Sequence, residues 1–119
     1  MVQQTNTNNN EAERLVGDYQ VVQEQIRSSA LQLEQLQMQK AELERAKEEV
    51  SGASGKVYIS VGGVIVETDK AKALEDISSK AELTQVRIGS LTKQFNDIKT
   101  KEKQLGEKLT QMLGGKDTG

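Results

Sequence analysis

The sequence predicts a mainly α-helical protein, an antiparallel two-helix coiled coil with a central β-hairpin. Three observations predict this fold. Proline is absent from all 119 residues while Leu, Glu, Lys, Gln and Ala abound, which favours long, uninterrupted helices. Apolar residues recur at heptad spacing in both halves of the chain. Between the two halves lies VYISVGGVIVET, residues 57–68, which has the composition of two short strands joined at a Gly-Gly turn.

The composition excludes several classes of protein. Only 34% of the residues are hydrophobic and 3% aromatic, which is too little for a compact monomeric core in a chain of this length. The absence of Cys and His excludes disulfides, thiol nucleophiles, zinc-finger sites and histidine bases. No carboxylates are spaced for a metal and no Gly pair has a phosphate-binding context, so we expect no enzyme activity and no cofactor.

Charge and hydropathy bear on partners and location. The net charge of −2 argues against a dedicated nucleic-acid-binding protein. No apolar run approaches the ~18 residues of a membrane span, so no membrane partner is expected. The start of the sequence lacks the charged and apolar regions of a secretory signal. We therefore expect a cytoplasmic protein.

The first helix is expected at about residues 11–50. It follows an Asn-, Thr- and Gln-rich lead, residues 1–10, that we expect to be disordered. Gly52 and Gly55 end the helix. The expected heptad seam is apolar at eight of eleven positions: Leu15, Tyr19, Val22, Ile26, Ser29, Leu33, Leu36, Lys40, Leu43, Lys47 and Val50.

The second helix is expected at about residues 69–113, with Thr68 or Asp69 as its N-cap and a flexible tail at residues 114–119. Residues 11–50 carry nine acidic and five basic side chains, whereas residues 69–113 carry seven acidic and nine basic ones. Opposite net charges favour mutual pairing of the helices. The expected seam is apolar at ten of twelve positions: Leu74, Ile77, Ala81, Thr84, Ile88, Leu91, Phe95, Ile98, Glu102, Leu105, Leu109 and Met112.

The hairpin is expected at about residues 56–68, with Gly62-Gly63 in a two-residue primed turn. This turn places Val61 opposite Val64, Ser60 opposite Ile65, and so on outward to Val57 opposite Thr68. Cross-strand partners share a face. One face is then aliphatic and is the expected oligomerisation surface: Val57, Ile59, Val61, Val64 and Val66.

The aliphatic face needs a covering. Burying its five side chains contributes roughly 7–15 kcal/mol as an upper bound, and an isolated hairpin is marginal in water. The coiled-coil seam is already occupied, and the hairpin edges carry unpaired backbone groups. We expect hairpins from several subunits to assemble into an oligomeric β-barrel platform, which removes these edges. The alternative is a hairpin that only caps the coiled coil.

These residues resemble the β-type subunits of the prefoldin family. The resemblance covers about residues 11–113 and rests on the two long helices and on Val57-Tyr58, Gly62-Gly63, Val66-Glu67 and Thr68-Asp69-Lys70. It implies a hetero-hexamer with two α-type and four β-type subunits, whose hairpins form a β-barrel platform. It also implies an ATP-independent chaperone that holds unfolded polypeptide clients at the coiled-coil tips and transfers them to a group II chaperonin.

The resemblance places client binding by location, at the first turns of the first helix and the last turns of the second. The apolar candidates there are Leu15, Val16, Tyr19, Leu109, Met112 and Leu113. Four of them lie on the expected seams, where they can pack with one another instead. Val16 and Leu113 lie beside the seams and are the stronger candidates.

Other functions remain as alternatives. The first is a structural coiled-coil adaptor or scaffold without chaperone activity, which would not need an aliphatic hairpin face. The second is a nucleic-acid-binding coiled coil that uses the lysines of residues 93–108, but acidic residues interrupt that stripe. The third is a coiled-coil probe with an acidic tip for a polymerase channel, which the aliphatic connection here does not fit.

Overall fold

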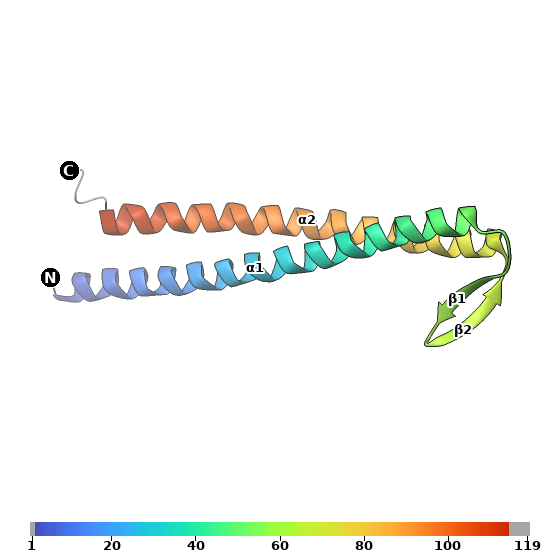
Figure 1. The fold of residues 1–119 in the computed structure, drawn as a ribbon. Coiled ribbons are helices and arrows are strands. Elements are labelled where there is room, and N and C mark those ends of the chain that lie inside the picture. The colour runs from blue at the N-terminus through green and yellow to red at the C-terminus, as the bar shows by residue number, and fades with distance from the viewer. Residues whose placement is uncertain (1, 115–119) are drawn as a thin grey trace. The chain divides into compact units, whose positions relative to one another are not determined.

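The computed structural model describes the backbone of residues 2–114 and the side chains of residues 9–114. Its elements follow in the order α1 (Val2–Gly52), β1 (Val57–Val61), β2 (Val64–Thr68) and α2 (Lys70–Gly114) (Figure 1). The strands form a two-stranded antiparallel sheet. The expected pair of long helices with a hairpin between them is thus confirmed.

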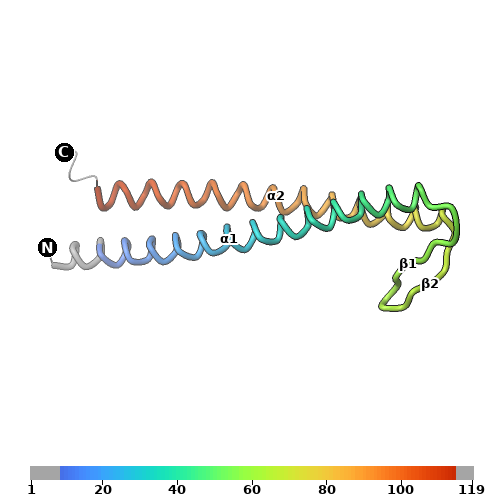
Figure 2. The backbone as a smooth tube through the Cα atoms, in the orientation of Figure 1, coloured from blue at the N-terminus to red at the C-terminus, as the bar shows by residue number. Residues whose placement is uncertain are grey.

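The chain divides into two compact units, and each unit contains a segment of α1 and a segment of α2. We call residues 32–91 the hairpin unit, because it contains β1 and β2 with the helical segments that flank them. We call residues 1–31 together with residues 92–119 the terminal unit. Figure 2 traces the backbone through the hairpin unit, where α1 leads into the hairpin and the chain leaves it along α2.

The start of α1 differs from the expected one. The sequence predicted a disordered lead over residues 1–10, whereas α1 begins at Val2. Residues 2–10 contain no proline or glycine, so nothing in them breaks a helix that is nucleated further along the chain. At the other end, α2 includes Gly114, and the rest of the expected flexible tail lies outside the described residues.

The seams agree closely with the expected ones. Every expected seam position of α2 is buried or half-buried. In α1 the one exception is Lys47, which is exposed, while Ala46 is half-buried in its place. A three-residue step from Leu43 to Ala46 keeps an apolar side chain inside and leaves the lysine ammonium in water, where its solvation is undisturbed.

The turn and register of the hairpin and the N-cap of α2 agree with the sequence-based predictions. Gly62 and Gly63 have φ angles of 55° and 85°, in the left-handed region that the primed turn requires. The register pairs Val61 with Val64 and Val57 with Thr68, as the sequence predicted. Asp69 is the N-cap, because its Oδ1 accepts a 2.7 Å hydrogen bond from the backbone N–H of Lys72.

Each unit has a small core of its own. In the terminal unit Leu15, Val22 and Leu105 are buried together. The hairpin unit buries Ala73 and Ile77 of α2. It also buries Thr84, whose hydroxyl donates a 2.9 Å hydrogen bond to the carbonyl of Lys80. That bond satisfies the one polar side chain found buried among the described residues.

Candidate functional site

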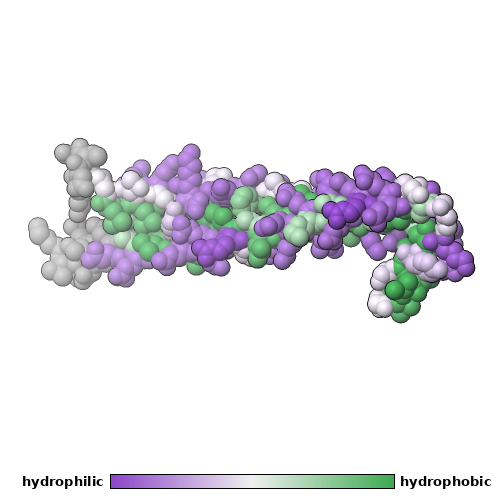
Figure 3. All heavy atoms as spheres, viewed as in Figure 1, coloured by the Kyte–Doolittle hydropathy of each residue, from purple (hydrophilic) through white to green (hydrophobic). Residues whose placement is uncertain are grey.

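The first face of the hairpin carries the five expected oligomerisation residues. Val61 and Val64 are 57% and 62% exposed, and Val66 is 43% exposed. Figure 3 shows apolar residues gathered on the hairpin surface. Within a single chain these side chains have nothing to pack against, so this surface is available to another molecule.

The foot of the hairpin is different. Val57 is only 7% exposed and Ile59 is half-buried. From the sequence, all five side chains were expected to be buried only by other subunits. Val57, however, is already buried within its own chain. The partner-free part of the first face is therefore the outer part, near the Gly62-Gly63 turn.

The second face of the hairpin is mixed, with Ser60 and Glu67 beside Tyr58 and Ile65. Ile65 is 73% exposed and Tyr58 is 58% exposed. On the same face, Lys56 Nζ lies 3.5 Å from Glu67 Oε1 at the foot of the hairpin. The hairpin thus presents exposed apolar side chains on both of its faces, with Ile65 as the one aliphatic residue of the second.

In the terminal unit, four of the six expected client-binding residues pack together. Leu15 is buried, and Tyr19, Leu109 and Met112 are partly buried against the core that it forms with Val22 and Leu105. These four side chains hold α1 and α2 together in this unit. Their surface is largely used by the coiled coil itself.

Val16 and Leu113, the other two candidates, remain exposed. Val16 is 40% exposed and Leu113 is 66% exposed. Residues three or four apart in a helix share a face, which links Val16 to Tyr19 and Leu113 to Leu109. Tyr19 in turn lies over Gly106, where an added Cβ would be 3.6 Å from its Cε2. Val16 and Leu113 therefore lie on the same flank of the terminal unit.

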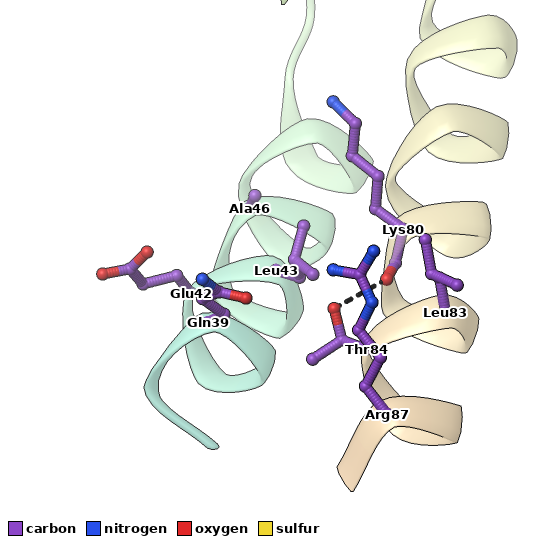
Figure 4. Close-up of a pocket in the computed structure, with 8 residues that line it drawn as sticks. All are labelled: Gln39, Glu42, Leu43, Ala46, Lys80, Leu83, Thr84 and Arg87. Carbon is purple, nitrogen blue, oxygen red and sulfur yellow. Dashed lines mark hydrogen bonds between the residues drawn. The ribbon is translucent and has the colours of Figure 1, made fainter. Parts of the chain in front are cut away.

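The sequence did not anticipate a groove between α1 and α2 in the hairpin unit. The groove has a volume of about 450 Å³. Figure 4 shows Leu43 between the two helices, with the Arg87 side chain reaching toward it and Glu42 pointing away from α2. Leu83 also lines the groove and is 52% exposed. Leu83 is an apolar residue that does not belong to the heptad seam of α2. Its position in the sequence could have indicated an apolar surface beside the seam.

The described residues offer little for other kinds of site. Among residues 9–114, no group of three or more Asp or Glu side chains could hold a metal ion. No helix in the described part of the chain is long and apolar enough to cross a membrane.

The fold and these surfaces can be compared with known proteins. The family model described as "Prefoldin subunit" matches residues 13–116, which is most of the chain. The chain belongs to the prefoldin subunit family. Prefoldin subunits are components of a chaperone, so this chain belongs to the machinery of protein folding.

The relatives of this prefoldin subunit are β subunits. Prefoldin subunit beta of Thermococcus onnurineus is 31% identical over 105 residues, covering 87% of this chain and 90% of the relative. Prefoldin subunit beta of Methanosarcina acetivorans is 29% identical over 103 residues, covering 85% and 88%. The crystal structure of the prefoldin beta subunit from Thermococcus strain KS-1 matches with a TM-score of 0.80 at 26% identity, covering 87% of this chain and 93% of that one.

Proposed function

We propose that this chain is the β-type subunit of a hetero-hexameric prefoldin that holds unfolded polypeptides without ATP. The observation that carries the proposal is the hairpin, whose first face leaves Val61, Val64 and Val66 exposed in the single chain. An exposed aliphatic face of this kind fits a surface for contact with other subunits. A subunit that assembles through its hairpin requires such a face.

The assembly follows from the two free edges and the exposed face of the hairpin. Burying three valines contributes roughly 5–9 kcal/mol per subunit as an upper bound, and strand pairing between subunits satisfies the edge N–H and C=O groups. A closed barrel of hairpins supplies both kinds of contact. The resemblance to prefoldin sets the proposed stoichiometry at two α-type and four β-type subunits.

Client binding is proposed for the terminal unit. Val16 and Leu113 share a flank and expose aliphatic surface, and the partly buried Tyr19, Leu109 and Met112 border them. One such patch binds an unfolded chain weakly. Several patches on one hexamer engage the same client together, which raises the overall affinity without any new contact.

The remaining steps rest on the family resemblance. On that resemblance, the hexamer is proposed to transfer its clients to a group II chaperonin without hydrolysing ATP. The proposed location is the cytoplasm, where the chaperonin acts on new polypeptides.

The test is a pair of measurements on the full chain. Its native mass is determined alone and after mixing with an α-type prefoldin subunit, and each sample is added to a denatured test protein on dilution. We expect a mass of six subunits and suppression of aggregation by the mixture. A hexamer that leaves aggregation unchanged would favour a structural scaffold, and a chain that stays unassembled with the α-type subunit would contradict the proposal.

A further inference from the structure

The second face of the hairpin carries two exposed apolar side chains, Tyr58 and Ile65, that the proposed barrel does not bury. A barrel built from the first faces leaves the second faces on its outside, since the two faces of a strand point in opposite directions. Ile65 belongs to the second face and, at 73%, is the most exposed of the large hydrophobic side chains in the described part of the chain. Ile65 and Tyr58 are therefore available for a second contact.

The chain itself is not placed to supply that contact. At the foot of the hairpin, the first face holds the buried Val57 and the half-buried Thr68. The first face is thus the one turned toward the rest of its own chain, while Tyr58 and Ile65 are turned away from it. A contact with the second face would therefore come from another molecule.

The groove of the hairpin unit has the matching shape and chemistry. Its volume of about 450 Å³ exceeds that of an isoleucine side chain, and Leu43, Ala46 and Leu83 give it apolar walls (Figure 4). Two opposite charges also line it, Glu42 on α1 and Arg87 on α2, and the Arg87 side chain reaches in toward Leu43. Lys80 also lines the groove, but its Nζ is 3.0 Å from Asp76 Oδ2. No ion pair of Arg87 occurs among residues 9–114.

The hairpin carries the complementary charges next to its aliphatic side chains. Lys56 and Glu67 form an exposed pair on the second face, with 71% and 55% of their side chains exposed. Such a pair contributes little by itself and can be exchanged readily. Set against the groove, Glu67 can pair with Arg87 and Lys56 with Glu42, while Ile65, two residues along the strand from Glu67, enters the groove.

We propose that the second face of the hairpin docks into the α1–α2 groove of a second copy of this chain. This contact would join neighbouring β-type subunits on the outside of the barrel and would fix their order around it. The proposal rests on the proposed function, because the first faces must bring the subunits together.

Cross-linking tests the contact directly, because the natural chain contains no cysteine. One copy carries Ile65→Cys and a second copy, of different mass, carries Leu83→Cys; both are assembled with the α-type subunit and oxidised. We expect a disulfide-linked product of the two masses. Glu82→Cys is the matched control, since Glu82 lines the opposite flank of the helix pair. It should give none of this product.

A charge exchange supplies the second test. Arg87→Glu and Glu67→Arg should each abolish the cross-linked product, and the chain with both changes should restore it, because the pair is then reversed. A hexamer of normal mass with no cross-link, or with equal cross-linking at residues 82 and 83, would overturn the docking and leave the proposed function intact. Failure of the unsubstituted chain to form a hexamer would overturn both.

Discussion

Tyr19 of α1 lies directly over Gly106 of α2, so that a Cβ added to this glycine would lie 3.6 Å from Tyr19 Cε2. That distance is an ordinary van der Waals contact. Gly106 is helical and has no positive φ angle. Neither a positive φ angle nor a steric clash therefore requires glycine at this position. Glycine nevertheless lowers the stability of the helix relative to alanine.

Gly106→Ala should stabilise the terminal unit. Alanine is favoured over glycine inside a helix by about 1 kcal/mol, and its methyl group adds contact with the tyrosine ring. Thermal unfolding followed by circular dichroism should show a higher midpoint. Gly89→Ala is the control: it makes the same change in α2 with nothing within 4 Å of the new methyl group. It should stabilise the protein less, and an equal gain would show that the contact with Tyr19 contributes nothing.

Val22 tests the core of the terminal unit, because its side chain is only 2% exposed. Val22→Ala removes two buried methyl groups, which we expect to cost about 2 kcal/mol in free energy of unfolding. Val21→Ala is the matched control, one residue away and 57% exposed. It should change stability by less than about 0.5 kcal/mol. Denaturant unfolding of both variants measures the difference, and equal effects would mean that the seam is wrongly assigned.

Asp69 tests the entry into α2. Its carboxylate accepts the 2.7 Å hydrogen bond from the N–H of Lys72, so Asp69→Ala leaves that donor without its cap and should cost about 1 kcal/mol. Asp69→Asn should retain most of the stability, since Asn is an equally good N-cap. Chemical denaturation ranks the three proteins. A loss with Asn as large as that with Ala would show that the charge, and not the hydrogen bond, stabilises the helix.

The assembly prediction uses a cross-strand pair of the hairpin. Val61 and Val64 are opposite each other and exposed, so Val61→Asp with Val64→Asp should leave the single chain folded. In a barrel the two carboxylates would be buried without partners, at a cost of several kcal/mol. We expect normal helical circular dichroism and no hexamer with the α-type subunit by light scattering.

The control for that prediction adds the same charge elsewhere. Ser79→Asp with Ser90→Asp places two carboxylates at exposed positions of α2 and should leave the hexamer intact. Assembly by the hairpin variant, at the same concentration as the natural chain, would contradict the barrel of first faces.

The sequence predicted some features fully because local chemistry determines them. The turn at Gly62-Gly63 sets the register of the hairpin, and a register shifted by one residue would turn the valines to the other face. The two helix seams follow from heptad spacing, with Lys47 as the single misplaced position. The start of α1 was not predictable in this way, because the polar residues 2–10 carry no periodicity.

Other features depend on how side chains meet in three dimensions. The burial of Val57 depends on the direction in which the hairpin leaves the loop after Gly52, which no spacing encodes. The groove beside Leu83 is formed by residues of both helices, including Leu43 and Arg87. Heptad spacing predicts which residues lie on the seams but not how the flanks beside the seams pack. The contact between Tyr19 and Gly106 likewise joins residues that are distant in the sequence.

The last prediction concerns client binding, and the packing of the terminal unit decides which variant tests it. Deleting the residues after Lys108 would remove Leu109 and Met112, which pack against the core, so lost activity could reflect lost structure. Val16→Ser with Leu113→Ser changes only exposed side chains. The hexamer should persist, while suppression of the aggregation of a diluted, denatured protein falls severalfold, because every copy loses its aliphatic patch. Val21→Ser with Leu31→Ser is the control, as both residues are 57% exposed in the same unit. If this control loses as much activity as the test variant, exposed apolar surface in general, and not the flank of Val16 and Leu113, holds the client.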